Sequence, residues 1–248
     1  MADAFWKTDD HTGDHYTLLL SRLHDVLKPR TYLEIGTLNG DTLALARCPS
    51  VAIDPDFQLS TGVTQGKATC LLAQMESDRF FESYNARAFL GGEVDMAFLD
   101  GMHLYEYLLR DFINTEKICK KKSIIFIHDC LPPDAFVARR NAADRQLEAL
   151  SPHSEWWAGD VWKALLILRQ ARPELRILAF DAAPTGLVAV TNLDPESDVL
   201  SREYFPLIDS VRNVTMSDIG ASEFRKMMNY TSTASVADAA GVAQYFWL

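Results

Sequence analysis

The chain has 248 residues, of which 48% are hydrophobic, and its formal net charge is −10. The negative charge argues against DNA or RNA as the main partner, because binding to phosphates needs a basic surface. No apolar stretch reaches the roughly 20 residues that span a bilayer, and the first residues lack the pattern of a signal peptide. The cysteines lack paired or zinc-type spacing, so we expect a soluble, cytoplasmic protein with free, mostly buried thiols.

The spacing of apolar residues predicts strands that alternate with helices. In chain order the expected elements are a helix over 15–27, a strand over 31–35, a helix from about 41, strands over 50–53 and 68–72, a helix over 78–84, a strand over 94–99, a helix over 105–119, a strand over 124–127, a helix over 160–172, and strands over 176–180 and 187–191. Such alternation favours a parallel sheet with helices on its faces.

The same pattern predicts the organisation of the domain. We expect an N-terminal helical segment over 1–30, a core over 31–194 and a helical C-terminal extension over 195–248. Within the core, residues 131–158 show no periodic pattern and are rich in Pro, Arg, Asp and Trp. Irregular stretches of this length inside a compact domain are usually lids or binding loops.

A glycine-containing turn follows the first predicted strand. Glu34 stands near the end of that strand, and Gly36 and Gly40 follow it as Gly-x-x-x-Gly. Gly36 can adopt dihedrals closed to other residues and lets a ligand approach the backbone, whereas Gly40 would let the expected helix pack closely. The spacing differs from the Gly-x-Gly-x-x-Gly of dinucleotide-binding folds. Glu34 favours a cationic ligand without phosphate, which describes S-adenosylmethionine, and Asp54 ends the second strand where a carboxylate commonly binds ribose.

Acidic and histidine side chains also stand where later strands end. Asp100 ends the strand over 94–99, and His128 and Asp129 follow directly on the next strand. Because adjacent strands lie about 4.8 Å apart, these three residues can share one divalent ion, and Mg²⁺ or Mn²⁺ suits their oxygen-rich set. His103 follows Asp100 by three residues, so we expect it over the same pocket, where an imidazole can remove a proton from a hydroxyl.

These motifs resemble the class I S-adenosylmethionine-dependent methyltransferases. The resemblance implies an α/β, Rossmann-like, doubly wound and mostly parallel seven-stranded sheet with an antiparallel last strand, flanked by helical N- and C-terminal appendages. In that family the acidic residue and the glycine turn hold the methionine end of the cofactor, and the carboxylate after the second strand holds its ribose. The cofactor-binding residues so implied are Glu34, Gly36, Thr37, Gly40, Asp54, Glu76 and Ser77, the last two near the adenine.

A longer stretch narrows the resemblance to one bacterial branch. Asp100-Gly101-Met102-His103-Leu104-Tyr105, the Arg110-Asp111-Phe112 that follows and the strand ending in His128-Asp129 are similar to the metal-dependent sugar O-methyltransferases of macrolide biosynthesis. Residues 8–11 and 15–16 also look like the leader of that branch. In those relatives the positions of Asp100, His128 and Asp129 bind Mg²⁺, and the histidine matching His103 is the proposed base.

Two departures from that branch are visible. His128 stands where the relatives have an acidic residue, and Lys120-Lys121-Lys122 replaces a Pro-Gly-Gly turn before the fifth strand. We expect the lysine run to be a solvated loop. The resemblance implies an enzyme that methylates a hydroxyl of a sugar, a glycoside or a related small molecule, and a homo-oligomer is compatible with the sequence.

Other interpretations stay open. A nicotinamide-dependent oxidoreductase could use a similar sheet, although the glycine spacing and Glu34 oppose it, and a non-catalytic relative could keep the nucleotide pocket. Asp100 could merely cap a helix, His103 could be structural, His128 and Asp129 could form a hydrogen-bonded turn, and residues 76–77 could be an ordinary helix start. Packing is the expected role of the tryptophans Trp156, Trp157 and Trp162.

Overall fold

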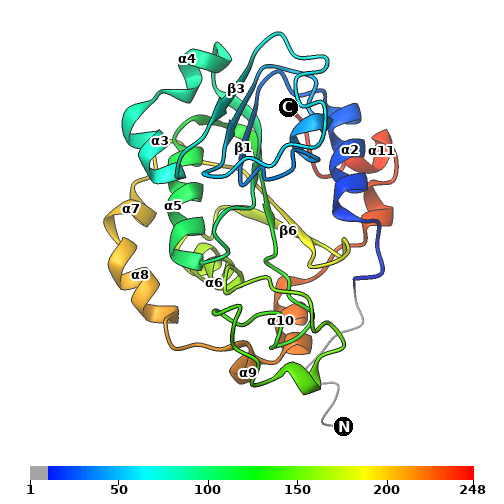
Figure 1. Ribbon diagram of the computed structural model, residues 1–248, viewed down its shortest axis with the longest axis vertical. Helices are drawn as coiled ribbons and strands as arrows, with labels where there is room; N and C mark the ends of the chain where they lie inside the picture. The colour runs from blue at the N-terminus through cyan, green and yellow to red at the C-terminus, as the bar shows by residue number, and fades with distance from the viewer. Residues whose placement is uncertain (1–10) are drawn as a thin grey trace.

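The computed structural model describes residues 11–248, so Thr8-Asp9-Asp10 and the first ten residues of the 1–30 segment lie outside the described residues. At its centre is one seven-stranded sheet with the order β3-β2-β1-β4-β5-β7-β6 (Figure 1). The strands are β1 (Tyr32–Ile35), β2 (Ser50–Ile53), β3 (Cys70–Ala73), β4 (Val94–Leu99), β5 (Cys119–His128), β6 (Arg176–Phe180) and β7 (Leu187–Thr191). Neighbours from β3 to β5 are parallel, whereas β7 is antiparallel to β5 and β6. The predicted Rossmann-like sheet with its antiparallel last strand is confirmed.

The register of the central strands brings their carboxyl ends to one edge. Ile35, the last residue of β1, lies opposite Ile53 of β2 and Leu99 of β4. Leu99 in turn lies opposite Ile127 of β5. The residues that follow these strands therefore gather in one place, at the edge where open α/β sheets bind their ligands.

Helices cover both faces of the sheet. They are α2 (Tyr16–Leu27), α3 (Ser77–Ser83), α4 (Ala86–Leu90), α5 (Tyr105–Glu116), α6 (Trp162–Ala171), α7 (Val199–Arg202), α8 (Tyr204–Val211), α9 (Met216–Ile219), α10 (Ala221–Met228) and α11 (Ala239–Val242), with 3₁₀ turns η1 (Leu43–Leu45), η2 (Glu148–Leu150) and η3 (Thr233–Val236). Figure 1 shows α3, α5 and α8 on one side of the sheet and α2 and α11 on the other. Within residues 11–248, no helix is long and apolar enough to cross a membrane.

Two apolar cores separate these layers. Met96 and Phe98 of β4 pack toward α2 and α11, whereas Ala97 and Leu99 pack toward α3, α5 and α6. Both faces of the strand are buried, which explains why its sequence is a nearly continuous apolar run and not an alternating one. The four cysteines are free thiols, and three of them are buried, as expected.

The prediction of a helix from about residue 41 is wrong. Only the 3₁₀ turn η1 forms there, because few residues separate the glycine turn from Pro49, which precedes β2. The Nζ of Lys67 donates hydrogen bonds to the carbonyls of Leu43 at 2.8 Å and Ala46 at 2.5 Å, which satisfies backbone groups that a helix would otherwise use. Gly40 has φ 85°, which is not helical, and a Cβ there would lie 2.5 Å from Val63, so only glycine fits this turn.

The prediction of a loop for the lysine run is also wrong, because these lysines belong to β5. Lys120 forms an ion pair with the buried Asp95, whereas Lys121 and Lys122 are exposed. Helix α4 was not predicted from the sequence, although residues that commonly begin and end helices were present at its two ends. The Asn85 side chain accepts a hydrogen bond from the Arg87 amide at 3.0 Å, and Gly91 ends the helix with φ 74°.

Candidate active site

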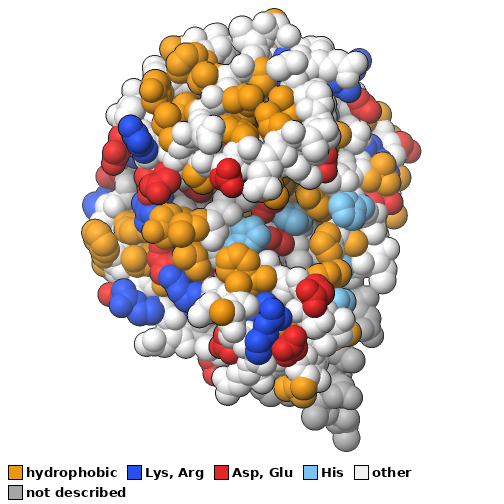
Figure 2. Space-filling view, viewed as in Figure 1, with side chains coloured by type: hydrophobic (Ala, Val, Ile, Leu, Met, Phe, Trp, Pro, Cys, Tyr) orange, Lys and Arg blue, Asp and Glu red, His pale blue; other side chains and the backbone are white. Residues whose placement is uncertain are grey.

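Four polar side chains meet where β4 and β5 end. His128 Nδ1 lies 3.4 Å from Asp100 Oδ1 and 3.5 Å from Asp129 Oδ1. His103 Nε2 lies 3.4 Å from Asp100 Oδ1, and its Nδ1 lies 3.3 Å from Asp129 Oδ2. The structure therefore brings together every residue that the sequence assigned to the metal or to the base. Figure 2 shows histidine and acidic side chains gathered in a hollow of this face.

This cluster has the donor set of a cation site. Asp100 Oδ1, His103 Nδ1 and His128 Nδ1 are buried, and they make the ion-pair contacts given above but no hydrogen bond. One ligand atom each from Asp100, His103 and Asp129 lies within 4.8 Å of the others. Carboxylate and imidazole ligands at such distances fit a divalent cation. Two of these three residues were in the predicted metal set, and His128 contacts the same carboxylates.

The charges of the cluster are strongly coupled. Burial disfavours the charged form of Asp100, but the charges of the neighbouring His128 and His103 hold the pKa of this carboxyl below its usual range. Burial alone would lower the pKa of His103, yet Asp100 and Asp129 raise it to about 9. They also raise the pKa of His128 against the effect of burial. The imidazoles thus carry the balancing positive charge, and a metal would compete with their protons.

His103 is fixed by residues from distant parts of the chain. Its φ is 55°, a left-handed conformation that is unusual for a residue with a side chain. The Asp160 amide donates a hydrogen bond to its carbonyl at 3.2 Å. A Cβ on Gly159 would lie 1.8 Å from the same carbonyl, so only glycine fits there. The ring of Trp157 stacks on the imidazole with centroids 5.1 Å apart and planes at 26°.

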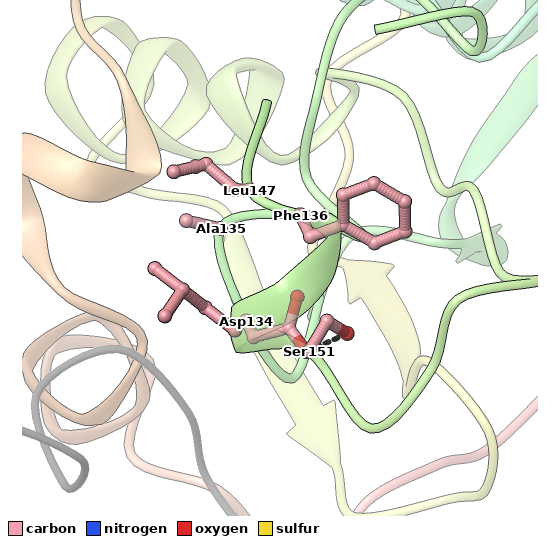
Figure 3. A pocket seen from close by; sticks show the side chains of 6 residues that line it. Asp134, Ala135, Phe136, Leu147 and Ser151 are labelled. Carbon is pink, nitrogen blue, oxygen red and sulfur yellow. Dashed lines mark hydrogen bonds between the residues drawn. The ribbon is translucent and has the colours of Figure 1, made fainter. Parts of the chain in front are cut away.

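Trp157 belongs to the segment 131–158 that was expected to be a lid, and this segment is irregular apart from η2. It is nevertheless folded against itself. The Trp157 Nε1 donates a hydrogen bond to the Arg139 carbonyl at 2.8 Å. Figure 3 shows a small pocket within the segment, where the Ser151 hydroxyl donates to Asp134 Oδ2 at 2.6 Å beside Phe136. The segment therefore presents a preformed aromatic surface to the cluster.

Glu34 lies in β1, just before the glycine turn. This side chain is fully buried, and Tyr32 donates a hydrogen bond to its Oε2 at 2.6 Å, while Oε1 has no hydrogen-bond partner. Burial raises the pKa of Glu34 to about 7, although hydroxyls of Tyr32, Thr37 and Thr42 oppose the effect. A positive charge nearby would stabilise the carboxylate, which fits a cationic cofactor.

The turn also packs against the neighbouring strand ends. Gly36 has φ 84°, and a Cβ there would lie 1.9 Å from the Asp100 carbonyl oxygen. Asp54 accepts hydrogen bonds from the amides of Leu38 and Asp56, both at 2.7 Å. Asp54 therefore shapes the loop, and its buried carboxylate lies at the end of β2 as predicted.

The remaining predicted cofactor residues begin α3. Glu76 occupies the N-cap position without a capping hydrogen bond from its side chain, and Ser77 is the first helical residue. The Ser77 hydroxyl forms a hydrogen bond with Asp111 of α5, a buried carboxyl whose pKa burial raises to about 7. Asp111 lines a hollow together with Asp100 and Gly101, so it borders the cluster.

Sequence reasoning did not assign three residues that contact the cluster. The ring centroids of Tyr16 and His128 lie 4.0 Å apart. The Thr185 hydroxyl donates a hydrogen bond to Asp129. Trp157, whose expected role was packing, packs on the ring of His103. Tyr16 was noticed only within the leader-like pair 15–16, and nothing in the sequence around Thr185 signals its role. Trp162 does pack in the core, 5.5 Å from the ring of Phe224.

One protein family and several solved structures are similar to this chain. Residues 77–130 match the family described as a methyltransferase domain. No curated protein matches the chain. The chain is similar to a putative O-methyltransferase from Klebsiella pneumoniae (16% identity over 71% of this chain and 79% of that chain, TM-score 0.48) and to cofactor-bound Rv0187 from MTB (15%, 73% and 80%, TM-score 0.49). It is also similar to the SAH-bound methyltransferase PaMTH1 of Podospora anserina (15%, 71% and 77%, TM-score 0.49). The family match over residues 77–130 and the order of the sheet agree with the resemblance to methyltransferases.

Proposed function

We propose that the protein is an S-adenosylmethionine-dependent O-methyltransferase that acts on a hydroxyl of a small acceptor, such as a sugar or a glycoside, with a divalent cation. The observation that carries this proposal is the meeting of two carboxylates and two imidazoles beside the glycine turn. The contact of Gly36 with the Asp100 backbone puts the turn and the carboxylates at one edge of the sheet. The family match over 77–130 spans the ends of both β4 and β5.

The cofactor would lie over the glycine turn. S-adenosylmethionine, when bound, supplies a methyl group on a positively charged sulfur. Glu34 would complement the positive charge of its methionine end, which Gly36, Thr37 and Gly40 would accommodate. Asp54 would accept hydrogen bonds from the ribose, since its buried carboxylate oxygens already accept them from amides. Glu76 and Ser77 would lie near the adenine.

Asp100, Asp129 and His128 would hold the cation. A divalent ion, when bound there, would lower the pKa of the acceptor hydroxyl and fix its position. His128 is 8% exposed and lies between Tyr16 and the carboxylates, so it is better suited to ligation than to contact with an acceptor. Nδ1 of His128 and Oδ1 of Asp100 lie 3.4 Å apart and make no hydrogen bond, which supports this assignment.

Asp100 and Asp129 raise the pKa of His103 to about 9, so a bound cation, which competes with this proton, would be needed to keep the ring neutral. In that neutral form His103 would accept the proton of the acceptor hydroxyl. Its side chain is 24% exposed, and its backbone is held in place by Gly159 and Asp160. Trp157 and the rest of the 131–158 segment would exclude water and orient the acceptor, which are effective sources of rate in methyl transfer. The grouping of His103 with Asp100 and Asp129 within 4.8 Å supports one variant of this proposal, in which the two histidines exchange roles.

The test is methyl transfer by the whole chain to a panel of sugars and glycosides. With S-adenosylmethionine and Mg²⁺ or Mn²⁺, we expect S-adenosylhomocysteine and a methylated product, both abolished by excess chelator. Thermal stabilisation by NAD but not by S-adenosylhomocysteine would overturn the proposal. Titration with Mn²⁺ separates the two histidines. We expect His128→Gln to weaken Mn²⁺ binding and His103→Gln to reduce turnover alone, and the reverse result would establish the exchanged roles.

A further inference from the structure

The lysine run of β5 lines a groove far from the candidate active site. Lys121 stands near the start of β5 and His128 at its end, which corresponds to about 23 Å of extended strand. The groove has a volume of about 330 Å³, within the range of pockets that hold small molecules. We call it the basic groove and define it by residues that line it: Lys121, Lys122, Arg176, Tyr245, Phe246 and Trp247.

The charges of the basic groove are all of one sign. Neither Lys121 nor Lys122 has an ion-pair partner within residues 11–248, whereas the adjacent Lys120 is paired with Asp95. Arg176 donates a hydrogen bond to the Tyr245 carbonyl at 3.0 Å, so its guanidinium is held at the groove. Among the described residues that line it, none is acidic. In a chain of net charge −10, a local excess of cations is a departure that an anion would balance.

The groove also offers aromatic surface. The Arg176 guanidinium lies 5.6 Å from the centre of the Tyr245 ring, and this ring lies 6.3 Å from that of the buried Phe246. Trp247 is 54% exposed, so much of its side chain remains available to a ligand. Large exposed aromatic side chains beside unpaired cations favour a ligand that has both a flat ring and a negative charge.

We propose that the basic groove binds a small organic anion with an aromatic ring, such as an aromatic carboxylate. The carboxylate would lie against Lys121 and Lys122, and the ring against Tyr245 and Trp247. This site is separate from the cofactor and acceptor sites, because it lies at the opposite end of β5. The inference stands on the groove itself and does not depend on the proposed methyltransferase activity.

The test is calorimetric titration of the whole chain with 1-naphthoate and with the uncharged 1-naphthalenemethanol. We expect one saturable site for naphthoate and clearly weaker binding of the alcohol. The double variant Lys121→Gln/Lys122→Gln should weaken the binding of naphthoate by roughly two- to thirtyfold, the range for two exposed charge contacts. Trp247→Ala should also weaken it. Lys226→Gln, an exposed lysine of α10, is the matched control and should leave the affinity unchanged.

Four results would overturn the proposal. The first is the absence of saturable binding up to about 10 mM naphthoate, beyond the millimolar range of weak specific sites. The second is equal affinity for the alcohol and the acid, and the third is an unchanged affinity in the double variant. The fourth is loss of naphthoate binding in saturating S-adenosylhomocysteine, which would locate the anion in the cofactor pocket. If the double variant melts at a lower temperature than the wild type, the single Lys122→Gln variant decides.

Discussion

Replacing Asp111 by Asn should change how the stability of the protein depends on pH. Asp111 is 3% exposed, and burial raises the pKa of its carboxyl from 3.8 to about 7 despite the hydrogen bond with Ser77. In the unfolded chain the carboxyl keeps its ordinary pKa. Below about pH 4 the Asp111 carboxyl is protonated in both the folded and the unfolded state, so it does not lower the free energy of unfolding. As pH rises toward 7, only the unfolded state gains from ionisation, so folding loses stability, and above pH 7 the loss stays constant.

The size of the loss follows from the two pKa values. The gap between 3.8 and about 7 amounts to about 4 kcal/mol when the carboxyl is ionised in both states. Between pH 5 and pH 8, about 2 to 3 kcal/mol of this loss should appear, because part of it has already accrued at pH 5. Asn cannot ionise and keeps a similar shape. The stability of Asp111→Asn relative to wild type should therefore increase by that amount over this interval.

Urea unfolding at pH 5, 6, 7 and 8 measures this difference directly. Comparison with wild type at each pH cancels the titration of other groups, including the buried Glu34. Asp25→Asn, on the exposed side of α2, is the control for the removal of one carboxylate from the protein surface. The reasoning is refuted if the Asp111→Asn difference is flat across this range, or if the variant loses relative stability as pH rises.

Three further predictions concern the site. Gly36→Val should abolish binding of S-adenosylhomocysteine in calorimetry, because a Cβ would lie 1.9 Å from the Asp100 carbonyl oxygen, whereas Gly62→Val, where a Cβ meets nothing within 4 Å, should bind normally. Asp129→Ala should lose metal-dependent turnover yet keep its affinity for S-adenosylhomocysteine, and full activity in chelator would contradict the cation's role. His103→Gln should reduce turnover by about 10²–10⁴, the usual contribution of a general base, and retention of more than about a tenth would point to His128.

The sheet could be predicted because its signals are local. A strand buried on both faces, such as β4, is a short apolar run that ends at a polar residue, and the alternation with helices implies parallel order. The carboxyl ends of parallel strands lie at one edge of the sheet. The strand assignments alone therefore predicted that Asp100 would lie close to His128 and Asp129. The errors arose where long-range contacts decide. Lys67 donates hydrogen bonds to the carbonyls of Leu43 and Ala46 at η1. Lys120, within β5, forms an ion pair with Asp95.

The sequence predicts His103 as the base and His128 as a metal ligand, but the residues around them in the chain give no physical reason for that division of roles. Both imidazoles lie within 3.5 Å of the same two carboxylates, so the local motifs treat them alike. What differs is their surroundings, which come from segments far away in the chain. His128 is enclosed by Tyr16, whereas His103 is stacked on Trp157 and remains partly exposed. Enclosure favours a fixed ligand and exposure favours contact with an acceptor, so the packing of α2 and of the 131–158 segment separates two side chains that the motifs cannot distinguish.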